Sequence, residues 1–184
     1  MSRLNTFSSV TEAPAASQAT LNAVGKALGV VPNLFRTVAN SPAALKGYTG
    51  LSAASGEGTL SKPTLERIAL AVAEVNGCGY CLSAHTYLAR NVAKLDDIEI
   101  SANRSGRSND EKADAAVRFA VAITEARGHV ADKDVAAVKA AGYTDAEVVE
   151  IVLAVALNTF TNYLNEVAQT ELDFPAAATL RKAA

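Results

Sequence analysis

Residues 61–85 read SKPTLERIALAVAEVNGCGYCLSAH, and this stretch holds the clearest structural and chemical signals of the chain. Ser61 is a typical helix N-cap, with a proline in the first turn behind it. An apolar stripe then runs toward Gly77, which predicts that this helix ends or bends there. A second helix is expected to begin directly afterwards, at Cys78 or Gly79.

Helical patterns recur along the whole chain and strand patterns do not, which predicts an all-α fold in a single domain spanning residues 1–184. Residues 96–106 are expected to form a polar connection with a short helix at its start, and residues 1–16 and 175–184 to be loose. The other expected helices cover residues 17–28, 32–39, 42–54, 109–126 capped by Asn109, 132–141, and a last one from a capping box of Thr144 and Glu147 through Val167.

The sequence also repeats itself weakly. A shift of 83 positions lays residues 68–73 over 151–156 and Ser61 over Thr144, so a duplicated helical unit is a hypothesis of this pattern. Chance recurrence in alanine-rich helices is the alternative. In the second copy, valine, threonine, leucine and alanine replace Glu66, Cys78, Cys81 and His85, so only the first copy is predicted to be catalytic.

Composition indicates a soluble intracellular enzyme. Of 184 residues, 49% are hydrophobic and 20% charged, which suffices for a substantial core. The net charge of −2 and the scattered basic residues disfavour nucleic-acid binding. No signal peptide and no apolar run of membrane-spanning length is recognised, so we expect a cytoplasmic protein without a membrane partner.

The only two cysteines, Cys78 and Cys81, are three residues apart, and His85 follows four residues later. A structural zinc site would need four ligands. Cys78, Cys81 and His85 supply three, and His129 is the one further histidine or cysteine in the sequence, so no metal or other cofactor is predicted. A structural disulfide across so short a loop would stabilise little, although two buried core thiols remain an alternative. Reversible thiol chemistry is the favoured interpretation.

Glu66 and Glu74 lie upstream as candidate proton-handling groups, although either carboxylate could simply face solvent. Cys81 and His85 are at i and i+4, on one face of a helix, so the imidazole can accept the thiol proton. Tyr80 is a secondary candidate that could pack or donate a hydrogen bond. A polar stripe in the last helix is expected to form an interface or surface (Asn158, Asn162 and Asn165), and His129 to be a loop residue.

Glu66 is separated by eleven intervening residues from Cys78-Gly-Tyr-Cys81, and His85 follows. This pattern resembles the core motif of the alkylhydroperoxidase AhpD family, within the carboxymuconolactone decarboxylase superfamily. Residues 31–35, Val-Pro-Asn-Leu-Phe, resemble the start of its peroxidase-related members. The resemblance implies an all-α fold and a homo-oligomer, trimer or hexamer, that reduces hydroperoxides with electrons from an external dithiol. It assigns Cys81 as the peroxidatic cysteine, Cys78 as the resolving cysteine, and Glu66 with His85 as a proton relay.

One residue departs from that family pattern, because the best-studied branch has a histidine where this chain has Tyr80. Two other functions remain open. A lyase or isomerase of the lactone-decarboxylase kind would use His85 as acid and base without a thiol cycle. A redox-sensing scaffold would change its assembly on oxidation and turn over no peroxide.

Overall fold

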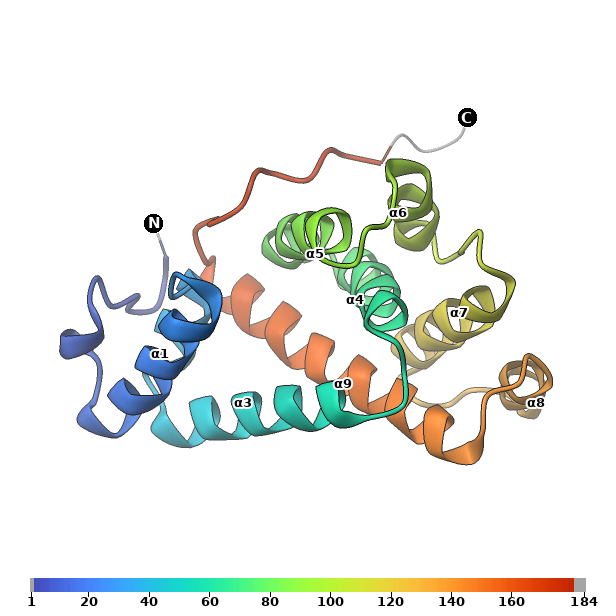
Figure 1. The fold of residues 1–184 in the computed structure, drawn as a ribbon, viewed down its shortest axis with the longest axis horizontal. Helices are drawn as coiled ribbons and strands as arrows, with labels where there is room; N and C mark the ends of the chain where they lie inside the picture. The colour runs from blue at the N-terminus through green and yellow to red at the C-terminus, as the bar shows by residue number, and fades with distance from the viewer. Residues whose placement is uncertain (1, 181–184) are drawn as a thin grey trace.

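Helices form the fold of residues 2–180 in the computed structural model of this chain, and no strand occurs among them (Figure 1). The predicted all-α fold is thereby confirmed. The elements are the short 3-10 helix η1 (Val10–Glu12), followed by α1 (Ala15–Leu28), α2 (Asn33–Val38), α3 (Pro42–Glu57), α4 (Lys62–Asn76), α5 (Gly79–Asn91), α6 (Asp97–Arg104), α7 (Glu111–Ala126), α8 (Asp132–Ala140) and α9 (Asp145–Ala168).

Two of the three predicted side-chain caps start helices where the sequence places them. The Ser61 hydroxyl accepts from the Thr64 N–H at 3.2 Å, and Thr144 forms the expected capping box with Glu147. The predicted cap of α7 is wrong by one residue. Asp110 accepts from the Ala113 N–H at 2.9 Å, whereas the backbone N–H of Asn109 is occupied by Glu99.

The helix α4 is the centre of the molecule and contacts α5, α6, α7 and α9. Its residues from Ile68 to Ala73 are all buried, so it is apolar around its whole circumference rather than on one stripe. Burying one side chain of the size of Ile68 or Leu70 contributes about 1.5–3 kcal/mol. Because α4 is held on all sides, residues at its C-terminal end are held in fixed positions.

Both chain ends pack more closely than the sequence predicts. Phe7 and Ala13 are buried, and the Arg36 guanidinium donates to the Phe7 carbonyl at 2.9 Å. The C-terminal segment runs over α5 toward α6 (Figure 1), where the Ala177 N–H donates to the Ser83 hydroxyl at 3.1 Å. Apolar and polar contacts therefore hold the described parts of residues 1–16 and 175–184, while residues 1 and 181–184 lie outside the described residues.

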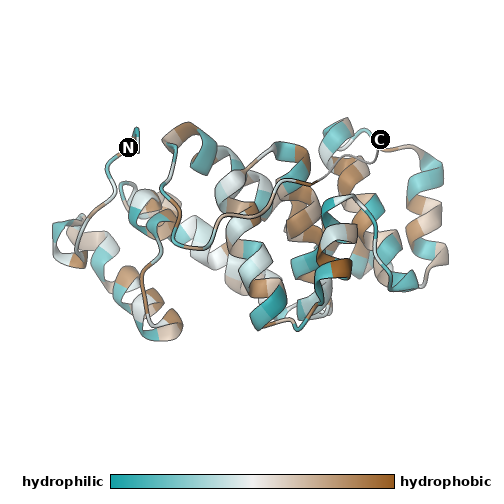
Figure 2. Ribbon diagram, turned by 90° about the horizontal axis from the view of Figure 1, so that it is seen from above, coloured by the Kyte–Doolittle hydropathy of each residue, from teal (hydrophilic) through white to brown (hydrophobic). Residues whose placement is uncertain are grey.

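The helix α9 crosses the molecule and packs against α4, α7 and α3 (Figure 1). Within residues 2–180 it is the one helix long and apolar enough, by length and composition alone, to cross a membrane, a test that core helices of soluble proteins also pass. The sequence analysis predicted the extent of this helix but recognised no apolar run of membrane-spanning length, because asparagines and acids interrupt the apolar residues. Figure 2 shows hydrophobic and hydrophilic residues alternating along the same helices, so most helices have a core side and an outer side.

Candidate active site

A sharp break between α4 and α5 creates the site. Gly77 ends α4 in the left-handed conformation, with φ of 69°, which glycine adopts without the penalty of a side chain. The next N–H, of Cys78, donates back to the Ala73 carbonyl at 3.0 Å and closes the end of the helix. Cys78 is then the N-cap of α5, and Cys81 lies in its first turn.

The two cysteine sulfurs are in direct contact as free thiols. The Cys78 thiol donates to Cys81 Sγ at 2.7 Å, and the Cys81 N–H donates to Cys78 Sγ at 3.3 Å. Cys78 is fully buried and Cys81 is 3% exposed. The role of Cys78 as N-cap of α5 fixes it next to its partner, in agreement with a helix predicted to begin at Cys78 or Gly79.

The surroundings separate the two thiols in acidity. The hydrogen bond from Cys78 is the largest influence on Cys81 and lowers its pKa to about 6 against the opposing effect of burial, with help from the charge of His85. The same hydrogen bond, together with burial, raises the pKa of Cys78 well above its usual range. These opposite shifts favour a proton on Cys78 and a thiolate on Cys81.

Glu66 and His85 meet beside the cysteines, from α4 and α5. Glu66 Oε2 lies 2.9 Å from His85 Nδ1, and the two side chains are 21% and 22% exposed. Burial lowers the pKa of His85, but the charge and hydrogen bond of Glu66 outweigh this and raise it. A proton on Nδ1 directed at the carboxylate leaves Nε2 as the ring nitrogen that exchanges protons with the site.

The two secondary candidates lie in different places. The Tyr80 hydroxyl donates to Asp173 at 2.5 Å and accepts from the Leu34 N–H at 3.3 Å, so it joins α5 to α2 and the C-terminal segment. Glu74 is engaged elsewhere, in an ion pair of 2.7 Å with Arg104. Glu74 therefore contributes to packing between α4 and α6 and does not join the cysteines.

The asparagines of α9 are part of the site, and their assignment to a surface or interface is wrong. Asn158, Asn162 and Asn165 are buried, and the Asn165 amide donates to Cys81 Sγ at 3.3 Å. Their spacing of four and three residues on an otherwise apolar helix was the signal available in the sequence. His129 lies in the connection between α7 and α8, as expected.

A cavity of about 350 Å³ opens onto Cys81. Its wall includes Glu66, His85 and the aromatic ring of Tyr48, a residue that the sequence analysis did not identify, but not Cys78. Most of the remaining lining is apolar: Leu28, Leu34, Phe35, Leu65, Ala69, Ala84, Leu88, Ala154 and Leu157. A small molecule with an apolar body can therefore reach the reactive sulfur while its polar end meets the Glu66–His85 pair.

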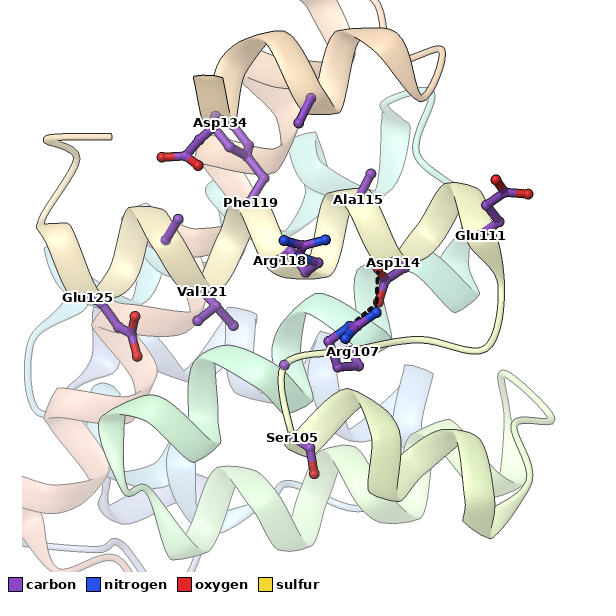
Figure 3. A pocket seen from close by; sticks show the side chains of 13 residues that line it. Ser105, Arg107, Glu111, Asp114, Ala115, Arg118, Phe119, Val121, Glu125 and Asp134 are labelled. Carbon is purple, nitrogen blue, oxygen red and sulfur yellow. Dashed lines mark hydrogen bonds and ion pairs between the residues drawn. The ribbon is translucent and has the colours of Figure 1, made fainter. Parts of the chain in front are cut away.

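A second cavity, of about 460 Å³, lies against α7 and α8, and Figure 3 shows its charged lining. Arg107 and Asp114 pair across it at 2.8 Å, and neither a cysteine nor a histidine lines it. Within residues 2–180, no group of three or more histidine, cysteine, aspartate or glutamate side chains is arranged to hold a metal ion. The cavity at Cys81, although smaller, is the one with reactive groups.

Comparisons with known proteins match the part of the chain that contains this motif. Residues 42–126 match the carboxymuconolactone decarboxylase family model, whereas no curated protein sequence matches significantly. The fold is similar to that of the AhpD-core, peroxidase-related protein from Ralstonia eutropha JMP134, with a TM-score of 0.83 and 22% identity over 94% of this chain and 92% of that one.

Two further solved structures share the fold. A peroxidase-related protein from Silicibacter sp. TM1040 gives a TM-score of 0.78 and 23% identity over 92% of this chain and 89% of that one. The debrominase Bmp8 gives 0.73 and 20% identity over 86% and 87%. Residues 42–126, which contain the Glu66, Cys78, Cys81 and His85 motif, are thus similar to the carboxymuconolactone decarboxylase family, and the chain has the fold of the AhpD-like, peroxidase-related structures.

Proposed function

We propose that this protein is a thiol-dependent peroxidase that reduces organic hydroperoxides through Cys81 and Cys78. The observation that carries the proposal is the Cys81 sulfur, which faces an apolar cavity, touches Cys78 at 2.7 Å and lies beside the Glu66–His85 pair. The apolar lining favours alkyl or aryl hydroperoxides over hydrogen peroxide because it gains from burying their hydrocarbon part.

The first chemical step oxidises Cys81. Its thiolate attacks the terminal oxygen of the hydroperoxide, the O–O bond breaks, and the departing alkoxide takes a proton from the Glu66–His85 pair to leave as an alcohol. Cys81 becomes a sulfenic acid. This step needs the thiolate and a proton donor at the same time, which a lowered Cys81 pKa and a raised His85 pKa supply together.

The second step joins the two sulfurs. Cys78 attacks the Cys81 sulfur, a disulfide forms, and the sulfenic oxygen leaves as water with the proton of Cys78. An external dithiol then reduces the disulfide and is itself oxidised to a disulfide. We propose this donor, together with a cytoplasmic homo-oligomer, as the setting of the reaction. Analytical ultracentrifugation of the reduced protein measures the oligomeric state.

The test is consumption of cumene hydroperoxide with dithiothreitol as the reductant. We expect turnover by the wild type, none by Cys81→Ser, and a single sulfenic acid on Cys81 in Cys78→Ser, trapped by a dimedone probe. Sulfenic acid on Cys78 alone, in Cys81→Ser, would reverse the roles of the two cysteines.

The same assay separates the alternatives. A lyase would leave peroxide untouched and keep its activity in Cys81→Ser, and a redox scaffold would show only a change of assembly on oxidation. Because one structural neighbour is a debrominase that was solved with 2,3,4-tribromopyrrole, that compound is a useful second substrate. Release of bromide without peroxide consumption would reject the peroxidase proposal.

A further inference from the structure

Two asparagines of α9 lie against the reactive sulfur and are almost completely shielded from solvent. Asn162 and Asn165 are 0% and 2% exposed. The Asn165 amide nitrogen donates to Cys81 Sγ at 3.3 Å. Asn162 accepts from the Asn76 amide through its oxygen at 2.9 Å, which fixes the orientation of its own amide and leaves its NH2 group as a donor.

The polar groups of this pair are not all satisfied. Asn162 Nδ2 and Asn165 Oδ1 are buried and have no hydrogen-bond partner among residues 2–180. A buried polar group without a partner typically costs about 1–3 kcal/mol, and native proteins keep few of them. An apolar residue at either position would avoid this cost, so packing alone does not account for amides here.

We propose that Asn162 and Asn165 are positioning residues that solvate the Cys81 thiolate. This inference deepens the proposed function and rests on it, because it identifies what keeps the peroxidatic sulfur charged inside an apolar site. A thiolate accepts several hydrogen bonds, and Cys81 Sγ already receives those of Cys78 and Asn165. The NH2 group of Asn162 is a further donor close to this sulfur, and it lowers the pKa of Cys81.

The amides differ from the other groups around Cys81 because they carry no charge. The titratable groups that face it are Cys78 and Tyr80 near the start of α5, His85 paired with Glu66, and Tyr48 from α3. A neutral donor stabilises the thiolate at every pH. Loss of an amide is therefore expected to move the midpoint of the Cys81 titration, whereas loss of His85 would also change its shape.

Solvation of the thiolate also has a redox consequence. The amides stabilise the reduced form of the pair and have no charged sulfur to bind in the disulfide. Their removal is therefore expected to stabilise the disulfide relative to the dithiol and to make the reduction potential more negative. A tenfold change in the equilibrium constant corresponds to about 30 mV for this two-electron couple.

The test measures how fast iodoacetamide alkylates Cys81 in the reduced full-length protein as a function of pH, with the modified residue located by mass spectrometry. Asn165→Leu and Asn162→Leu are each expected to raise the midpoint by about one unit, or tenfold less thiolate at low pH, as for a hydrogen bond to a charged group. Asn103→Leu is the matched control, because this buried asparagine of α6 bonds to Glu99 instead. It should lower Tm and leave the midpoint unchanged.

The outcomes are separable from those of the peroxidase assay, because alkylation needs no peroxide. An unchanged midpoint in both folded leucine variants would overturn the role of the amides. Asn165→Asp keeps the size of the side chain and covers the case in which leucine prevents folding. Its carboxylate should raise the midpoint further, and an unchanged midpoint there also rejects the inference. A low midpoint in a wild type that consumes no peroxide would reject the proposed function alone.

Discussion

The α4–α5 unit and α9 are the two regions that the 83-residue shift lays over one another, and they differ at one decisive position. Gly77 breaks the first unit with a left-handed turn, whereas Phe160 occupies the matching position and α9 continues without a break for 24 residues. A bulky side chain is strongly disfavoured in the left-handed conformation. The break creates a helix N-terminus in one unit, and its absence produces a long continuous face in the other.

The two units then have complementary roles. The first supplies the reactive groups, with Cys81 in the first turn of α5, where the helix dipole favours an anion. The second lacks these groups and supplies the buried amides that face them, including the Asn165 hydrogen bond to Cys81. The amide of Asn76, at the end of α4, bonds directly to Asn162 of α9. The comparison teaches that one unit carries the chemistry and the other provides its environment.

The largest effect is expected on the rate of peroxide reduction, from variants that remove the proton-handling groups of the first unit. Glu66→Gln or His85→Gln should slow peroxide reduction about a hundredfold or more, because each removes the proton relay, and Tm should remain near that of the wild type. Val149→Gln is the matched change in α9, at the position that the shift assigns to Glu66, and Val149 is exposed. It should leave the rate unaltered. Equal rates in all three variants would contradict the relay.

A pH series sharpens the same contrast. Because the pKa of Cys81 is lowered to about 6, its thiolate is present above that pH and is lost as pH falls through it. Sulfenic acid formation in a single turnover should therefore fall about tenfold for each pH unit below 6. Stopped-flow measurement of the first oxidation step gives this profile. A midpoint near 9 would mean that the environment leaves Cys81 with the ordinary pKa of a thiol.

The break itself is tested by Gly77→Ala. A side chain at this φ of 69° is strained although nothing lies within 4 Å of the added carbon, so unfolding should become easier by about 1–2 kcal/mol. Gly50→Ala is the control, since Gly50 lies inside α3 with the same open space around it and should stabilise by about 0.5–1 kcal/mol. Urea unfolding measures both. Equal effects of the same sign would remove the special role of Gly77.

The smallest effects are expected on stability, from the two helix caps that the 83-residue shift lays over one another. Ser61→Ala and Thr144→Ala should each cost about 1 kcal/mol of unfolding free energy, because each removes the hydroxyl that accepts the N–H three residues later. Of the two caps, only Thr144 also donates its own N–H to the Glu147 carboxylate, at 2.7 Å. Glu147→Ala should therefore destabilise α9, whereas Thr64, the matched residue of α4, hydrogen-bonds the Ser61 hydroxyl instead, so Thr64→Ala has no such bond to the backbone to lose. Denaturant midpoints measured side by side decide this.

The sequence by itself determined the local features. Caps at Ser61 and Thr144, the stop at Gly77 and the periodicity of the helices depend on residues within a few positions of one another, and these predictions agree with the structure. The spacing of Cys78, Cys81 and His85 on one helix start is likewise local. Glu66 needed the family resemblance, because nothing within α4 itself distinguishes it from a solvent-facing acid.

Only the tertiary structure decided which distant residues meet. Asn165 reaches Cys81 across 84 positions because α9 packs against α5, and Glu74 turns to Arg104 because α6 lies beside α4. Asp173 and Phe174 hold the C-terminal segment against Tyr80, which composition could not foresee. Such contacts depend on the packing of whole helices, so no short-range pattern in the sequence encodes them. The local sequence therefore set the two sulfurs and their mutual hydrogen bond in place, and the fold added the amide of Asn165 and the cavity in front of Cys81.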